Sequence, residues 1–115
     1  MVCNKTIFYE YVEIYNKHKK LYGEKTVLLM EVGMFYEMYS LNDGITGPPL
    51  FDLSNLLNIL CTKKNKNIKE VSEKNPYMAG VPIKSIDKYI ELLINNNYTV
   101  IIVDQFDNDM GKNSK

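Results

Sequence analysis

The feature that most constrains the fold is an apolar run that a glycine joins to a second, aromatic-rich run. Residues 27–32 contain one charged side chain and have the composition of a buried strand. Gly33 permits a sharp backbone turn, and residues 34–39 continue as a strand rich in aromatic side chains. Because side chains alternate between the two faces of a strand, Phe35 and Glu37 share one face. If the other face packs on the core, an apolar ring and a carboxylate stand side by side on the surface.

The remaining segments alternate between helical and extended patterns. Apolar residues recur at three- and four-residue steps in three segments, and β-branched or short apolar runs lie between them. The expected elements are a helix over 6–22 capped by Thr6, a helix over 53–60 capped by Asp52, strands over 61–64 and 77–81, a helix that follows Ser85 and ends near residue 95, and a strand over 99–106 in the interior of the sheet.

The order of these elements predicts an α/β fold, a small mixed β-sheet surrounded by α-helices. With 115 residues the chain has room for one domain with a modest core, and 45% hydrophobic residues are typical of a globular protein. We expect this domain to span residues 1–106. Residues 107–115 lack an apolar pattern and are expected to form a flexible tail or linker to the remainder of a longer chain.

Several functional classes have no signature in the sequence. Cys3 and Cys61 have no neighbouring metal-ligand pattern and are expected to be reduced thiols. No glycine-rich phosphate loop or dinucleotide fingerprint is present. No apolar run approaches the roughly 20 residues that cross a bilayer, and the N-terminus lacks a signal-peptide pattern. We therefore expect an intracellular protein without a membrane partner, a metal or a cofactor in this domain.

The charge is balanced, with 14 basic and 14 acidic residues and a formal net charge of zero. Proteins that bind nucleic acid on their own usually carry a basic excess, because phosphate neutralisation supplies much of the affinity. If this domain contacts nucleic acid, it is expected to bind weakly by itself.

Four segments together resemble MutS-type DNA mismatch-repair proteins. Phe35 and Glu37 resemble the Phe-x-Glu reading motif near the start of these proteins, and residues 22–30 resemble the strand before it. Residues 78–82, Met-Ala-Gly-Val-Pro, and residues 100–105, Val-Ile-Ile-Val-Asp-Gln, resemble later segments in the same order. The chain departs from the family at Met34, where an acidic or small residue is common, and over residues 44–51. The resemblance implies the fold of MutS domain I.

The resemblance implies a mismatch-recognition role for Phe35 and Glu37 and no catalytic site. An apolar wedge inserted from the minor groove unstacks a base step at a cost of a few kcal/mol, and the cost is smallest where pairing is defective. Stacking of a ring on a base contributes about 1–3 kcal/mol. Phe35 would therefore settle at mismatches. Glu37 is repelled by phosphates, so its value would lie in one hydrogen bond to the mispaired base, for which it must be protonated if the partner is an acceptor such as purine N7.

Six further residues are predicted to contact DNA. Two lysines resemble the family's basic pair and would meet phosphates, although a solvated loop also explains them. Two residues at a helix N-terminus suit a phosphate, and two strand residues would press on the minor groove, although packing alone explains the methionine. The basic pair is Lys63 and Lys64, the residues at the helix N-terminus are Lys84 and Ser85, and the strand residues are Met78 and Gly80.

The resemblance also implies a larger parent chain. This parent is expected to carry an ATPase with ATP and Mg²⁺ in a distant part, to pair with a second copy of itself on mismatched double-stranded DNA, and to act with downstream repair factors. We expect it to reside wherever the DNA it serves resides.

Two other functions remain open at this point. One is a small metal-dependent nuclease that uses Glu31, Glu37 and Asp104, although no Asp…Glu-x-Lys arrangement falls on the predicted strands. The other is a protein-interaction module with Phe35 as its hot spot. Mg²⁺-dependent cleavage would distinguish the first, and comparison of G·T-mismatched with matched duplex would distinguish the second.

Overall fold

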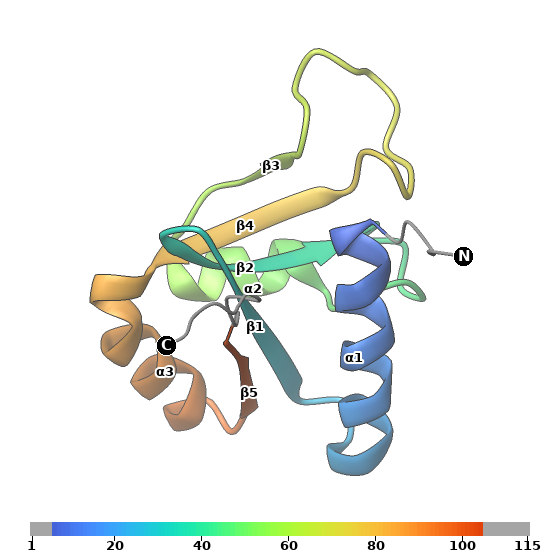
Figure 1. Ribbon diagram of the computed structural model, residues 1–115. Coiled ribbons are helices and arrows are strands. Elements are labelled where there is room, and N and C mark those ends of the chain that lie inside the picture. Colours follow the sequence, from blue (N-terminus) through green and yellow to red (C-terminus); the bar gives the residue numbers. More distant parts are fainter. Residues whose placement is uncertain (1–5, 105–115) are drawn as a thin grey trace, which may run out of the picture.

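The strands form one five-stranded mixed sheet in the order β3-β4-β2-β1-β5 (Figure 1). The computed structural model describes residues 6–104. β1 pairs antiparallel with β2 and parallel with β5, and β4 pairs antiparallel with both β2 and β3. The predicted α/β class with a mixed sheet is confirmed. The strands are β1 (Thr26–Val32), β2 (Phe35–Ser40), β3 (Cys61–Lys63), β4 (Tyr77–Pro82) and β5 (Thr99–Val103).

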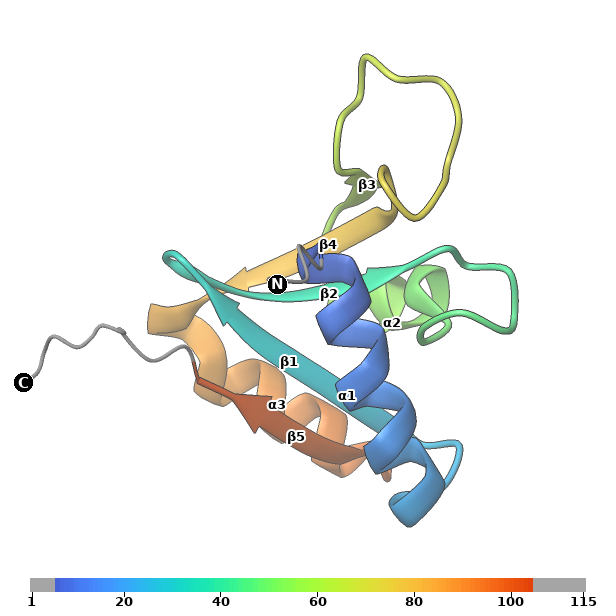
Figure 2. The same cartoon turned by 45° about the vertical axis from the view of Figure 1, so that its right-hand side comes forward.

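Helices cover the two faces of this sheet unequally (Figure 2). α1 (Ile7–Tyr22) packs against β1 and β2 on one face, and α2 (Leu50–Leu57) and α3 (Ile86–Asn95) lie against the other. A short 3₁₀ turn, η1 (Ile83–Ser85), joins β4 to α3. α1 packs only on the β1 and β2 part of its side of the sheet. On that side, the part formed by β4 and β3 has no helix over it, and we call it the uncovered face (Figure 1).

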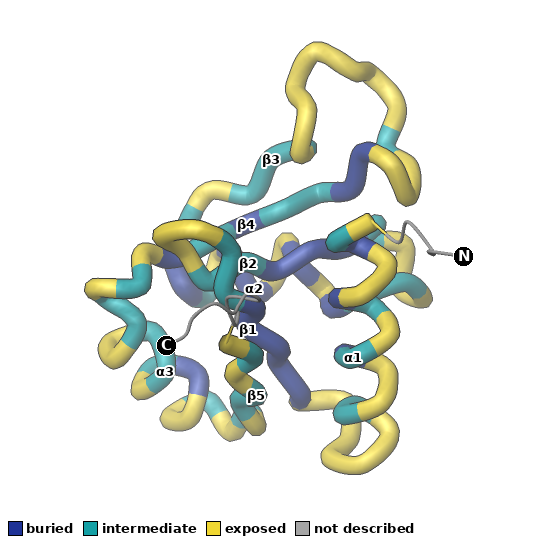
Figure 3. The backbone as a smooth tube through the Cα atoms, in the orientation of Figure 1, coloured by how far each residue is buried: buried dark blue, intermediate teal, exposed yellow. Residues whose placement is uncertain are grey.

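The core is densest along β1, whose first five residues are all buried (Figure 3). On the α1 side, Tyr11 and Tyr15 are buried, and the Tyr11 hydroxyl donates to the Leu28 carbonyl oxygen at 2.6 Å. A buried hydroxyl needs such a partner, because leaving it without a hydrogen bond is costly. Burial raises the pKa of Tyr11 well above its ordinary value.

α1 has the boundaries that its capping residues predict. The Thr6 hydroxyl accepts from the Tyr9 backbone N–H at 3.1 Å, and Gly23, with φ of 98°, donates its N–H to the Lys19 carbonyl at 2.7 Å. The spacing of apolar residues predicts an inward stripe of Ile7, Tyr11, Ile14, Tyr15, His18 and Tyr22. The structure differs at the two ends of this stripe, because Phe8 is buried and Tyr22 is 55% exposed.

The second helix lies three residues earlier than predicted. It begins after Pro49, whose carbonyl accepts the Leu53 N–H at 3.1 Å, so Asp52 lies inside the first turn and is not the cap. It ends at Asn58, which takes the left-handed conformation with φ of 57° that asparagine tolerates at a helix end. Leu60, which was expected in the helix, is 74% exposed beyond it.

The last strand is at the edge of the sheet, so its predicted place in the interior is wrong. β5 pairs with β1 alone within the described chain, and Ile102 is 38% exposed. Its β-branched residues predicted a strand correctly, because that pattern fixes extended structure and not the number of neighbours. The predicted extension through residue 106, the tail over 107–115 and Cys3 lie outside the described residues. Among residues 6–104, no helix has both the length and the apolarity that crossing a membrane requires.

Candidate nucleic-acid interface

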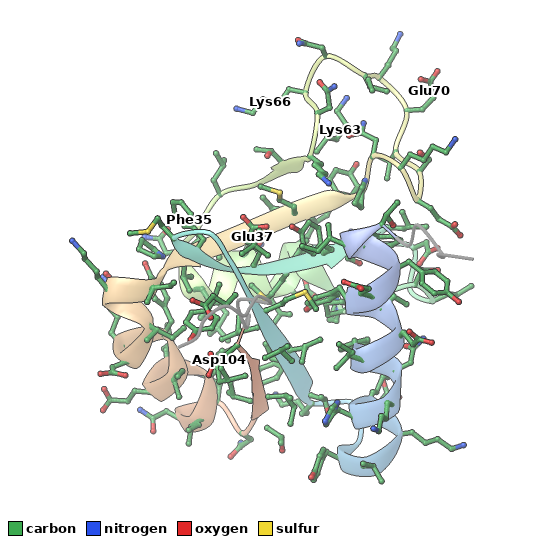
Figure 4. All side chains as sticks on the ribbon, viewed as in Figure 1. Phe35, Glu37, Lys63, Lys66, Glu70 and Asp104 are labelled. Atoms are coloured by element: carbon green, nitrogen blue, oxygen red, sulfur yellow. The ribbon has the colours of Figure 1, made fainter. Side chains whose placement is uncertain are left out.

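The β1–β2 turn presents Phe35 at the surface. Gly33 has φ of 62°, a conformation that favours glycine, and lets the chain reverse so that Val32 pairs with Phe35. The Ile83 N–H donates to the Met34 carbonyl at 3.1 Å and fixes the turn to η1. The Phe35 side chain is 44% exposed at the end of the strand (Figure 4).

Four of the predicted residues share the face of the sheet that α1 leaves uncovered. In the register of β2 and β4, Phe35 lies opposite Pro82 and Glu37 opposite Gly80. Met78, two residues before Gly80, is therefore on the same face. A Cβ at Gly80 would lie 3.3 Å from Cγ of Glu37 and 3.7 Å from Cβ of Phe35. Because Gly80 has no side chain, the space between the Phe35 ring and the Glu37 carboxylate is left open at the sheet surface.

Glu37 is held in place by the buried Tyr39, to which the sequence analysis gave no functional role. The Tyr39 hydroxyl donates to Oε1 of Glu37, and the Tyr39 ring, 1% exposed, packs edge-on against Tyr11 at 5.6 Å between centroids. Burial, and then this hydrogen bond, raise the pKa of Tyr39. The signal was present in the sequence, because a residue two positions after Glu37 shares its face.

The acids of the nuclease alternative do not converge. Glu31 pairs with Tyr36 and is the neighbour of Met30, which pairs with Glu37, so Glu31 and Glu37 lie on opposite faces. Asp104 accepts from the Tyr36 hydroxyl at 2.8 Å, and this hydrogen bond raises the pKa of Tyr36 to about 12. Within residues 6–104, no group of three His, Cys, Asp or Glu side chains has a geometry that would hold a metal ion.

The two predicted basic pairs lie at different places. Lys84 is exposed on η1, which is bonded to the Phe35 turn, and Ser85 is at the N-cap position of α3 without a side-chain cap bond. Lys63 pairs with Tyr77, which puts it on the face opposite Met78, and its Nζ donates to the Lys69 carbonyl at 3.1 Å. Lys64 follows it and is exposed. The structure thus groups Lys84 and Ser85 with Phe35, and separates Lys63 and Lys64 from it.

Comparison with known proteins identifies the family of the chain. Residues 9–115 match the family model of MutS domain I. A mutS homolog from Acanthamoeba polyphaga mimivirus, named for DNA mismatch repair, is 33% identical over 103 residues, which cover 88% of this chain and 9% of the relative. The DNA mismatch repair proteins MutS of Rickettsia rickettsii and Rickettsia felis are each 38% identical over 81 residues, 70% of this chain and 8% of the relative. The chain spans less than a tenth of the length of these relatives. Since the family model covers nearly all of the chain, the chain belongs to the MutS domain I family.

Proposed function

We propose that this domain recognises mismatched DNA by inserting the Phe35 ring into the base stack. The observation that carries the proposal is the exposed ring at a strand end, beside a carboxylate on an uncovered sheet face, in a chain of the MutS domain I family. The names of the relatives, which concern DNA mismatch repair, support the same substrate.

The ring reads how easily a base step deforms. Entry from the minor groove unstacks one step for a few kcal/mol, and stacking on the exposed base returns about 1–3 kcal/mol. At a paired step the balance is unfavourable, whereas a mispaired step has already lost part of its stacking and pairing energy. Phe35 therefore remains inserted where pairing is defective.

Glu37 adds a contact that a matched duplex does not offer. Its Oε1 accepts from Tyr39, so Oε2 is the oxygen that faces the mispaired base. When no base is displaced, the carboxylate gains no partner and its repulsion by phosphates remains. The absence of a side chain at Gly80 allows a base edge to approach Phe35 and Glu37, and Met78 beside them contacts the minor groove.

The basic residues hold the duplex without reading its sequence. Lys84 and Ser85, next to the Phe35 turn, contact phosphates close to the inserted ring, and the exposed Lys64 contacts the backbone farther along the sheet. Lys63 lies on the sheet face opposite Met78, so its predicted phosphate contact is not part of this proposal. A chain of zero net charge needs these contacts to be completed by the rest of a larger protein.

The parent protein supplies the remaining functions in this proposal. It carries an ATPase with ATP and Mg²⁺ outside this domain, binds mismatched double-stranded DNA as two copies, and passes the signal to downstream repair factors. This domain contributes recognition and no catalytic group. The parent acts inside the cell, where its DNA resides.

The test compares affinities of the parent protein for G·T-mismatched and matched duplexes by fluorescence anisotropy. Replacing Phe35 with Ala removes the stacking contribution of about 1–3 kcal/mol, so the preference for the mismatch falls by about 5- to 150-fold. Leu21→Ala, at a residue 67% exposed in the last turn of α1, is the matched control and keeps the preference. An unchanged preference in the Phe35→Ala variant would contradict the proposal.

A second variant tests the role of charge at Glu37. Glu37→Gln keeps the shape and removes the repulsion, so affinity for matched duplex is kept or raised and discrimination falls. A large loss of matched-duplex binding would contradict the repulsion argument.

A further inference from the structure

The segment 64–76 between β3 and β4 is a long exposed loop with an internal framework. It projects beyond the sheet and is exposed along most of its length (Figure 3). Asn75, 1% exposed, organises it: Oδ1 accepts the Asn65 N–H at 2.7 Å, and Nδ2 donates to the carbonyls of Ile68 at 3.2 Å and Glu70 at 2.9 Å. One buried amide thus fixes three points of the loop.

Backbone bonds complete this framework. The Lys64 N–H donates to the Pro76 carbonyl at 2.8 Å and closes the base of the loop. Ser72 and Asn75 exchange backbone bonds of 3.2 and 2.9 Å, which close a tight turn near its end. A loop with this many internal hydrogen bonds has a pre-formed backbone, so less backbone entropy is lost on binding than for a flexible loop.

The loop concentrates positive charge in a chain that is neutral as a whole. Residues 64–76 hold four lysines and two glutamates, a net charge of +2, whereas the complete chain has zero. Lys66 and Glu70 lie on opposite sides of the loop (Figure 4). The excess of exposed lysines over glutamates suits the loop to a polyanion.

The position of the loop relative to Phe35 sets its reach. The loop enters β4 at Tyr77, and Phe35 lies opposite Pro82 at the other end of that strand. Five residues of antiparallel strand span about 17 Å at about 3.4 Å per residue. Phosphates repeat every 3.4 Å along one DNA strand, so the base of the loop lies about five base pairs from the inserted ring, and the part that projects beyond the sheet lies farther away (Figure 3).

We propose that the loop 64–76 is a second DNA contact, an arm that binds phosphates flanking the mismatch through Lys66, Lys69 and Lys74. The proposal rests on the proposed function, because it takes the Phe35 face as the DNA-facing side. Contacts to phosphates carry no sequence information. The arm therefore strengthens binding to matched and mismatched duplexes by the same factor.

The test uses the parent protein with the triple substitution K66Q/K69Q/K74Q. Affinities for matched and G·T duplexes are measured between 50 and 200 mM salt. Both affinities fall together, their ratio is unchanged, and the slope of log K against log salt becomes shallower by up to about 2.7, since each lost phosphate contact removes about 0.9. The control K17Q/K20Q/K88Q changes the charge equally at lysines exposed outside the loop and leaves the slope within error of the wild type.

Asn75→Ala separates the shape of the arm from its charge. It keeps every lysine but removes the three bonds of the amide, so it lowers affinity for both duplexes in the same way. Circular dichroism confirms that the sheet is intact. If Asn75→Ala binds like the wild type, the framework is irrelevant and the proposal of a pre-formed arm is overturned.

Two asymmetric duplexes locate the contact. Each has three base pairs on one side of the mismatch and fifteen on the other. The wild type binds more weakly to the duplex whose short side lies toward the arm, and K66Q/K69Q/K74Q removes that difference. The proposal of the arm is overturned if the wild type binds the two duplexes equally, or if the salt slope of the triple variant is unchanged. If the wild type shows no preference for the mismatch while the triple variant still has a shallower salt slope, the Phe35 proposal is overturned and the arm is not.

Discussion

Removing the hydroxyl of Tyr39 tests whether the core positions Glu37, the carboxylate that we propose contacts the mispaired base. In Tyr39→Phe the ring keeps its place, because it is 1% exposed and packs against Tyr11. Only the hydrogen bond to Oε1 of Glu37 is lost. The substitution therefore frees one side chain on the uncovered face without changing its charge or its surroundings.

The size of the effect of Tyr39→Phe follows from the exposure of Tyr39 and Glu37. A hydrogen bond to a charged group contributes about 1.5–3 kcal/mol, but water replaces the donor at the half-buried Glu37, so the free energy of unfolding falls by about 1 kcal/mol. A released glutamate also regains rotamers that must be frozen again on binding, at up to about 1.5–2 kcal/mol. Mismatch preference is thus expected to fall by about tenfold.

A double-mutant cycle supplies the assay. The ratio of G·T to matched affinity is measured for the parent protein, Tyr39→Phe, Glu37→Ala and the double variant, with the unfolding midpoint of each. Tyr39→Phe lowers the ratio in the wild type and has no further effect when Glu37 is absent. If it weakens both duplexes equally, or lowers the ratio as much in the Glu37→Ala background, Tyr39 is only a core residue and the reasoning is refuted.

Three further predictions concern Gly80, alkaline pH and the first helix. Gly80→Ala pushes Glu37 aside, since the added Cβ would lie 3.3 Å from Cγ of Glu37. Anisotropy should show a lower mismatch preference, while chemical unfolding shows a change of less than about 1 kcal/mol in the free energy of unfolding. An unaltered preference would mean that the space at Gly80 is not needed for recognition. The raised pKa values of Tyr11 and Tyr39 mean that the folded state retains protons that the unfolded state, with a pKa of about 10, releases, so stability falls as pH rises above about 10; urea unfolding at pH 8 and pH 11 measures this, and equal midpoints would disprove it. Thr6→Ala removes the bond to the Tyr9 N–H and costs about 1 kcal/mol in thermal unfolding, whereas Thr6→Ser is expected to retain most of the stability, and equal losses in both would exclude capping as the cause.

The hairpin and the shared face of Phe35 and Glu37 followed from the sequence because they depend on local rules. A glycine between two extended runs permits the turn, and the two-residue period of a strand fixes which side chains share a face. The start of α1 at Thr6 is equally local, since a hydroxyl bonds a backbone group three residues ahead.

The features that the sequence did not reveal depend on partners distant in the chain. The edge position of β5 is decided by pairing between whole strands, which a β-branched run does not encode. Asn75 appears in the sequence as an ordinary polar loop residue, and only the folded loop brings three backbone groups to its amide. The shared face of Tyr39 and Glu37 is a local feature of the strand, but the packing of the Tyr39 ring against Tyr11, which fixes its hydroxyl beside Glu37, depends on a helix distant in the chain.

β2 is buried at its last three residues and emerges from the interior toward Phe35. Phe35 is thus the exposed end of a strand whose other end is fixed in the core, and the rigidity of that buried end limits how far the ring can move when it meets a base stack in the proposed role. Substitutions deep under α1, at residues that never meet a nucleotide, should therefore alter selectivity before they unfold the chain.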